Sequence, residues 1–198
     1  MHPYLYEKVT EWIPKKSRVL DLGTGDGAFL ESLQKQRDIY GEGVEINPEM
    51  MARCVERGLI MHQGDVLDGL DQYGSDTFDY ILLLGTFEEL EHPGAVLEEA
   101  FRVGKRVVIA YRNFGYFSIR MQLLFQGRAP VTKAVPCKWF DSPTAHFFSI
   151  QDFHEYCACM GFREIEQAYF NFRGPVTFWP NMRAEYALSL MEKIPEKS

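Results

Sequence analysis

The feature that most constrains this chain is a short apolar run that leads into a glycine-rich turn. Residues 19–22 (Val-Leu-Asp-Leu) have the length of a buried parallel strand. Glycines follow at positions 23, 25 and 27, and the apolar residues after them return at helical spacing. A strand, a glycine turn and a helix start together present free backbone N–H groups and the positive end of the helix dipole at one corner. The sequence therefore predicts a ligand-binding site at this turn.

The pattern around the glycines indicates which ligand to expect. A dinucleotide fingerprint reads G-x-G-x-x-G, whereas this chain reads D-x-G-x-G-x-G, with Asp21 just before the turn. A carboxylate there repels a pyrophosphate but suits a cation. Glu45 ends a second predicted strand, where an acid typically takes ribose hydroxyls, and Asp65 follows a third. Three acids at successive strand ends, with no lysine in the glycine loop, favour S-adenosylmethionine over NAD or ATP.

These motifs resemble the cofactor motifs of class I S-adenosylmethionine-dependent methyltransferases. The resemblance implies that S-adenosylmethionine or S-adenosylhomocysteine binds with its amino acid part on the glycine turn, its ribose on Glu45, and its adenine on Asp65 and the Val66 backbone. A glycine turn with solvated acids is the simpler interpretation for any one motif alone, but all three occur in order. The cofactor residues expected on this basis are Asp21, Gly23, Thr24, Gly25, Gly27, Glu45, Ile46, Gly64, Asp65, Val66 and Gly85.

Strands and helices alternate from the glycine turn to residue 111, which predicts a doubly wound, Rossmann-like α/β fold. The resemblance implies a mostly parallel seven-stranded sheet with a final antiparallel strand. Segments 163–172 and 185–191 are the candidates for an antiparallel pair, residues 68–76 for a loop, and Gly174-Pro175 for a turn. We expect residues 1–198 to form a single domain with an inserted basic and aromatic segment at 112–146.

The segment 112–146 interrupts this alternation. It carries five lysines and arginines against one acid, Asp141. It leaves the carboxyl end of the fifth predicted strand, the edge at which open α/β sheets bind ligands, so we expect it to cover the site. Its apolar residues at helical spacing predict an amphipathic helix whose stripe packs against the domain. That stripe consists of Phe114, Phe117, Met121, Leu124 and Phe125.

Composition excludes several classes of function. A net charge of −7 argues against nucleic acid as a partner. The four cysteines lack the spacing of a zinc site, and free thiols are typical of a reducing cytoplasm. The chain shows neither a signal peptide nor an apolar run of membrane length. We expect a cytoplasmic protein that uses no metal and binds neither nucleic acid nor membrane.

The later part of the chain narrows the resemblance to the MetW family. The chain differs from the family pattern at Thr24, at Cys137 and across residues 84–89, beside the expected cofactor site. The matching segments are 113–115 (Asn-Phe-Gly), 122–124 (Gln-Leu-Leu), 127–128 (Gly-Arg), 130–134 (Pro-Val-Thr-Lys-Ala), 139–143 (Trp-Phe-Asp-Ser-Pro), His146, 152–153 (Asp-Phe), 180–181 (Pro-Asn) and 184–185 (Ala-Glu).

The resemblance implies a role in methionine biosynthesis, in which some family members act with homoserine O-acetyltransferase. Two hypotheses stay open: a module that binds S-adenosylmethionine and regulates that partner, or a methyltransferase acting on a small-molecule acceptor. His146 is the candidate catalytic base, and a structural histidine that pins the long segment is the alternative. The residues expected to contact an acceptor or a partner are Tyr111, Asn113, Tyr116, Arg120 and Arg128.

Overall fold

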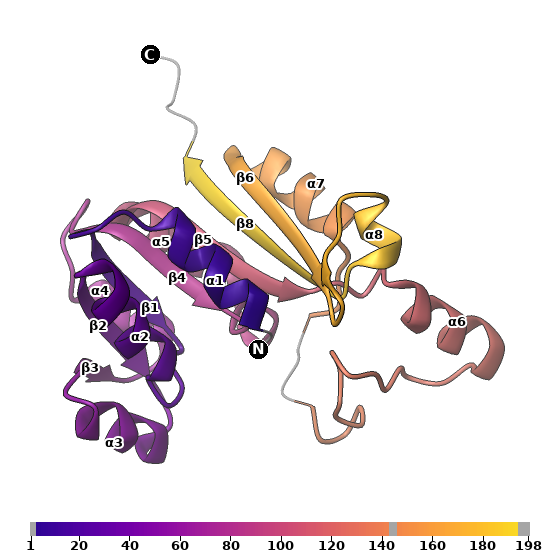
Figure 1. The fold of residues 1–198 in the computed structure, drawn as a ribbon, viewed down its shortest axis with the longest axis horizontal. Coiled ribbons are helices and arrows are strands. Elements are labelled where there is room, and N and C mark those ends of the chain that lie inside the picture. Colours follow the sequence, from indigo (N-terminus) through magenta and orange to yellow (C-terminus); the bar gives the residue numbers. More distant parts are fainter. Residues whose placement is uncertain (1–2, 143–145, 194–198) are drawn as a thin grey trace.

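A computed structural model describes residues 3–142 and 146–193 of the chain. They fold around one twisted eight-stranded sheet (Figure 1). The strand order is β3-β2-β1-β4-β5-β8-β6-β7. The first five strands along the chain pair in parallel and the last three pair antiparallel, as the sequence predicts. The strands are β1 (Arg18–Leu22), β2 (Tyr40–Glu45), β3 (Ile60–Gln63), β4 (Phe78–Leu84), β5 (Gly104–Arg112), β6 (Phe162–Asn171), β7 (Gly174–Pro175) and β8 (Tyr186–Lys193).

Helices cover both faces of the sheet. The buried apolar residues form two clusters, one under α1, α2 and α3 and the other under α4, α5 and α7.

In the described part of the chain, no helix has both the length and the apolar character that crossing a membrane requires. The helices are α1 (Pro3–Trp12), α2 (Ala28–Arg37), α3 (Pro48–Glu56), α4 (Val66–Asp71), α5 (Pro93–Val103), α6 (Phe117–Gln126), α7 (Ile150–Met160), α8 (Pro180–Arg183) and the short 3-10 helix η1 (Phe87–Glu89).

Strand β4 is buried on both sides. Ile81 and Leu83 belong to the cluster under α4, α5 and α7, whereas Tyr80 and Leu82 belong to the cluster on the opposite face. Side chains alternate between faces along a strand, so a strand covered on both sides is apolar at almost every position. This accounts for the continuous apolar run from residue 80 to 84.

Local signals in the sequence set the helix ends. The Asn47 side chain caps α3 by accepting hydrogen bonds from the backbone N–H groups of Glu49 (2.9 Å) and Met50 (3.3 Å). Ser149 and Asp152 form a reciprocal capping box at the start of α7. Gly161 ends that helix with φ 72°, a left-handed conformation that favours glycine.

Two expectations for local structure were wrong. Residues 68–76 are not simply a loop, because α4 spans Val66–Asp71. Asp65, the residue before the helix, caps it by accepting a hydrogen bond from Leu67 N (3.0 Å). Gly69 lets this helix approach β2 closely, since a Cβ there would collide with Val44. Gly174–Pro175 pairs with β6 as an eighth strand rather than forming only a turn.

Helix α6 forms where the spacing predicts it, but most of its apolar stripe does not pack against the domain. Phe117, Leu124 and Phe125 are 52%, 70% and 78% exposed, and Ile119 is the buried residue of this helix. Figure 1 shows α6 lying beyond the end of the sheet, away from the helices that cover its faces. Helical periodicity identifies an apolar face without indicating what covers it.

Asn113 connects the start of the 112–146 segment to the C-terminal part of the fold. Its side-chain N–H groups donate to the carbonyls of Asn181 (3.1 Å) and Ala184 (2.8 Å). Its side-chain oxygen accepts from Gly115 N (2.9 Å) and Ile150 N (3.3 Å). The residue is 1% exposed. We expected Asn113 to contact a substrate or partner, whereas the structure uses its hydrogen bonds within the fold.

Replacing Asn113 with Ala should lower the free energy of unfolding by about 3 kcal/mol, because buried backbone groups lose their partners. Urea unfolding followed by circular dichroism measures this. Gln122→Ala is the matched control, since Gln122 also bonds backbone N–H and C=O groups, those of Val131, but at the surface. The control should cost under about 1 kcal/mol. Equal costs would contradict the role assigned to Asn113.

Candidate ligand-binding site

Two adjoining cavities lie at the carboxyl edge of the parallel strands. The first, of about 620 Å³, is bordered by the ends of β2 and β4 and the start of α4. The second, of about 410 Å³, is bordered by the glycine turn, the end of β5 and residues 133–136. Gly23, Leu84 and Gly85 line both cavities. A single elongated ligand can therefore extend from one cavity into the other across the glycine turn.

The predicted cofactor residues divide between these cavities. Asp21 and Gly27 line neither: Asp21 is buried in β1, and Gly27 packs against Cys54 and Leu59. Those on the first cavity are Gly23, Glu45, Ile46, Gly64, Asp65, Val66 and Gly85. Those on the second are Gly23, Thr24, Gly25 and Gly85.

The glycine turn is held against β2 by its own backbone. The N–H groups of Gly23 (2.9 Å) and Thr24 (3.2 Å) donate to the Val44 carbonyl. Gly23 has φ 77°, and a Cβ there would collide with the hydroxyl of Thr86, which itself donates to the Leu22 carbonyl (3.1 Å). Glycine is required here because the chain must turn in a left-handed conformation against a neighbouring side chain.

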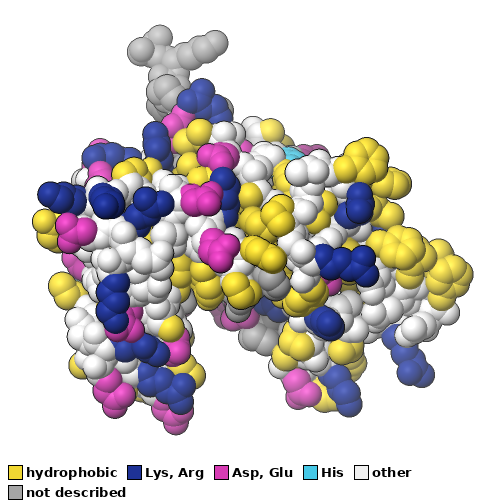
Figure 2. Space-filling model, in the orientation of Figure 1, with side chains coloured by type: hydrophobic (Ala, Val, Ile, Leu, Met, Phe, Trp, Pro, Cys, Tyr) yellow, Lys and Arg dark blue, Asp and Glu magenta, His cyan; other side chains and the backbone are white. Residues whose placement is uncertain are grey.

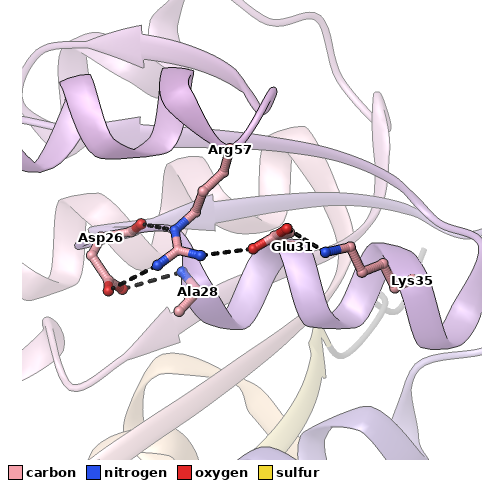
Figure 3. A network of polar contacts seen from close by, with 5 residues as sticks. All are labelled: Asp26, Ala28, Glu31, Lys35 and Arg57. Carbon is pink, nitrogen blue, oxygen red and sulfur yellow. Dashed lines mark hydrogen bonds and ion pairs between the residues drawn. The ribbon is translucent and has the colours of Figure 1, made fainter.

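A salt-bridge network closes the far side of the turn (Figure 3). Arg57, just after α3, donates from Nε to the Asp26 carbonyl (2.8 Å) and from a terminal nitrogen to the Glu31 carboxylate (2.8 Å). Lys35 pairs with the same carboxylate from the next turn of α2. The Asp26 side chain accepts from Ala28 N (3.1 Å) at the start of α2. Arg57 thus ties the turn, α2 and α3 together.

Glu45 joins the turn to the ligand edge. Its carboxylate accepts hydrogen bonds from Gly25 N (2.8 Å) and Asn47 N (2.8 Å), one on each oxygen, and the residue is buried. Two backbone donors fix the orientation of the carboxylate, while each oxygen keeps a further lone pair. The carboxylate can therefore accept hydrogen bonds from a ligand hydroxyl without losing its place in the fold.

Asp21 forms no ion pair with a lysine or arginine among the residues that the structure describes. It is 4% exposed, and burial together with the nearby charge of Glu45 raises its pKa from 3.8 to about 7. Both effects disfavour the carboxylate, the first by desolvation and the second by repulsion between like charges. A cation bound nearby would favour the ionised form. The electrostatics of this corner therefore suit a positively charged ligand.

Glu88 is a buried charged residue that sequence reasoning missed. It lies in η1 beside the second cavity and is fully buried. One carboxylate oxygen accepts from the backbone N (2.7 Å) and side-chain Nε (3.2 Å) of Arg112, and the other has no partner among the described residues. The sequence does contain two adjacent acids, Glu88 and Glu89, a few residues after the central strand. Burial and pairing with Arg112 depend on long-range contacts and could not be read from the sequence.

The residues expected to contact an acceptor or partner are dispersed. Tyr111 borders the second cavity, whereas Tyr116 borders a different cavity beside α6 and α8. Arg120 is exposed and donates from Nε to the Gly115 carbonyl (2.5 Å), and Arg128 is exposed just after α6. The structure therefore does not bring these residues into one site.

His146 lies apart from both cavities. Its Nε2 donates to the Leu90 carbonyl (2.9 Å), and its backbone N–H donates to the Glu88 carbonyl (3.0 Å). The ring borders a small apolar cavity with Phe87 and Phe148. These bonds pin the long segment to η1, the structural alternative considered for this histidine, and its role as a base stays a prediction.

The raised pKa of Asp21 has a consequence for stability. In the unfolded chain the pKa is near 3.8, so between about pH 4 and pH 7 the folded protein holds more protons and its free energy of unfolding falls as pH rises. Above pH 7 the full cost, on the order of 4 kcal/mol, is present. Asp21→Asn should remove it. Urea unfolding of both proteins at pH 5 and pH 8 should give a stability difference that grows with pH in favour of the variant; a constant difference would contradict the assignment.

Comparison with known proteins agrees with this architecture. A family model described as methionine biosynthesis protein MetW matches residues 5–191. The bifunctional methionine biosynthesis protein MetXA/MetW of Rhodopirellula baltica is 31% identical over 155 residues, which cover 74% of this chain and 25% of that protein. The chain therefore spans about a quarter of the length of this relative.

Solved structures share the fold. An S-adenosylmethionine-dependent methyltransferase from Thermotoga maritima has a TM-score of 0.70 at 18% identity, covering 96% of this chain and 88% of that one. A second, from Archaeoglobus fulgidus, has a TM-score of 0.70 at 17% identity, covering 96% and 93%. With this fold and a family match over nearly its whole length, the chain belongs to the MetW family of methionine biosynthesis proteins.

Proposed function

We propose that this protein binds S-adenosylmethionine or S-adenosylhomocysteine in the cytoplasm and regulates homoserine O-acetyltransferase. The observation that carries the cofactor assignment is the arrangement of three acids, Asp21, Glu45 and Asp65, along one edge of a methyltransferase-like sheet. Glu45 and Asp65 line the first cavity, and Asp21 is buried in β1 directly before the glycine turn that both cavities share. The volume of each cavity is within the range of small-molecule sites.

The chemistry of these residues fits this cofactor. The buried, like-charged pair of Asp21 and Glu45 favours a ligand that brings positive charge, which the ammonium and sulfonium groups of S-adenosylmethionine supply. Glu45 is oriented to accept hydrogen bonds from ribose hydroxyls. Asp65 uses one oxygen to cap α4 and keeps the other for the amino group of adenine, beside the backbone of Val66. When bound, the cofactor would supply an electrophilic methyl group.

Asp65→Asn tests this placement. The variant keeps an oxygen to cap α4 but replaces the other oxygen with an N–H donor that opposes the adenine amino group. We expect S-adenosylmethionine affinity to fall roughly ten- to a hundredfold in isothermal titration calorimetry, equivalent to about 1–3 kcal/mol. Asp68→Asn is the control, because Asp68 is exposed in the first turn of the same helix. Absence of binding to the unmodified protein at millimolar cofactor would refute the proposal.

The regulatory part of the proposal rests on the surface of the 112–146 segment. Exposed apolar residues of α6 lie beside lysine and arginine side chains (Figure 2). An apolar face that stays exposed on a folded domain marks an interaction surface. The relative whose name joins MetXA to MetW supports a partner in the same pathway. The free thiols of all four cysteines are consistent with the cytoplasmic compartment proposed here.

Charge reversal on this segment tests the partnership. Arg120→Glu and Arg128→Glu should each weaken binding of the homoserine O-acetyltransferase from the same organism, mainly by slowing association, with an effect that shrinks at high salt. Surface plasmon resonance measures both rates. Arg53→Glu, an exposed site on α3, is the control. Unchanged association rates for both segment variants would remove the segment from the interface.

Methyl transfer to a small acceptor is the second candidate function. The observation that favours it is the 410 Å³ cavity beside Gly85, bordered by Glu88 and Tyr111, which leaves room for an acceptor next to the cofactor. S-adenosylhomocysteine production in the presence of candidate acceptors would establish it. In that case His146→Ala tests the predicted base: turnover should fall with cofactor affinity nearly unchanged.

A further inference from the structure

A third cavity, of about 510 Å³, lies between the start of α6, the β6–β7 turn and α8. Its wall carries three cations, Lys133, Arg173 and Arg183, together with the rings of Tyr116 and Phe117. None of the three cations forms an ion pair with a carboxylate within 4 Å in the part of the chain that the structure describes. Three cations without such a partner therefore line one cavity of a chain whose net charge is −7.

The backbone holds the two arginines in place. Arg173 lies in the turn between β6 and β7, where its N–H donates to the side chain of Asn171 (2.9 Å). The same Asn171 side chain donates to the carbonyl of Arg183 (3.3 Å), and the N–H of Arg183 donates to the Trp179 carbonyl (3.1 Å). One asparagine therefore links both segments. The backbones that carry the two arginines are fixed before any ligand arrives, so binding has to order only their side chains.

The third cation is also held. The Lys133 ammonium lies over the ring of Phe172, 5.3 Å from its centroid. Among the described residues on the cavity wall, Glu185 supplies the one carboxylate, which accepts a hydrogen bond from Phe172 N (3.0 Å) and is buried. The cavity thus presents more positive charge than it neutralises. It fits a group that brings carboxylates.

Exposed aromatic side chains occur on the cavity wall and on the elements that form it. Phe117, on the cavity wall, is 52% exposed, and Trp179, at the start of α8, is 61% exposed. Figure 2 shows hydrophobic and basic side chains next to one another over the part of the molecule formed by α6 and α8. Rings at the rim with arginines among them are the composition enriched in protein–protein interfaces. A small metabolite would use the cations but leave these rings exposed.

We propose that this cavity receives a protein segment that carries carboxylates beside apolar side chains. The inference rests on the proposed function in one respect: the segment belongs to the partner enzyme, homoserine O-acetyltransferase. The carboxylates pair with Arg173 and Arg183, and the apolar side chains cover the rings at the rim. Lys133 lines both this cavity and the second cavity beside the glycine turn. Docking therefore takes place directly next to the ligand-binding edge.

The experiment measures the affinity of the full chain for the acetyltransferase at several salt concentrations. Arg173→Glu and Arg183→Glu should each weaken binding at least tenfold and reduce its dependence on salt, because an attractive charge pair becomes repulsive. Phe117→Ala should weaken binding while leaving the salt dependence unchanged, because it removes contact area and no charge. Arg53→Glu should change affinity less than twofold. All variants should keep the S-adenosylmethionine affinity of the unmodified chain, which reports that they are folded.

The outcomes separate the two proposals. If the unmodified chain binds the enzyme and both arginine variants bind equally well, this docking site is overturned and the proposed function stands. An equal loss in Arg53→Glu would also overturn it, because the effect would then be one of net charge. If the unmodified chain does not bind the enzyme, the proposed partnership fails and the docking site fails with it.

Discussion

The candidate site depends on one contact, the hydrogen bond from Gly25 N to the Glu45 carboxylate. With the bonds from Gly23 and Thr24 to the Val44 carbonyl, it attaches the glycine turn to the end of β2. The turn contributes the wall that both cavities share, so its position decides whether the two cavities connect. Glu45, which we expect to bind ligand, is therefore also structural. Removing the charge of Glu45 would move the glycine turn as well as remove a ligand contact.

This arrangement places two acids close together in a buried corner. Because Glu45 is held by two backbone donors, its charge stays near Asp21 and contributes to the raised pKa of that residue. The corner is therefore electrostatically unfavourable on its own. Strain of this kind at the end of parallel strands is common in binding sites, where the ligand relieves it. The same two carboxylates that cost stability favour a cationic ligand.

Much of the fold could be predicted because its signals are local. The glycine turn, the apolar run that fills most of β4 and the caps at Asn47 and Ser149 each follow from a few neighbouring residues. Helix α4 was missed because residues 68–76 are mostly polar and include glycine. The glycine within the helix, Gly69, is tolerated because β2 packs closely against it. The three acids of the candidate site could be predicted since carboxyl ends of parallel strands meet at one edge. The free-energy cost of burying them could not be predicted.

The features that could not be predicted depend on contacts between distant segments of the chain. Pairing of Glu88 with Arg112 crosses 24 residues, and the bonds from Asn113 to the stretch before β8 cross about 70. Neither contact corresponds to a pattern of residue spacing or composition in the sequence. The exposed apolar face of α6 is a different case, since its periodicity was read correctly but its covering was assumed to be the domain itself. Periodicity reports that a face is apolar, and only the folded structure reveals which surface is left to cover it.

Lys133 connects the two halves of the proposed activity. Its ammonium lies over Phe172, and its side chain belongs to the wall of both the second cavity and the docking cavity. A carboxylate arriving in one cavity and a ligand arriving in the other therefore act on the same cation. If each changes the position of that cation, the affinity of one must depend on the other to the same degree, since coupling between binding sites is reciprocal. Such a shared charge gives a regulator a direct physical route from cofactor to partner, without any change in the sheet that supports both sites.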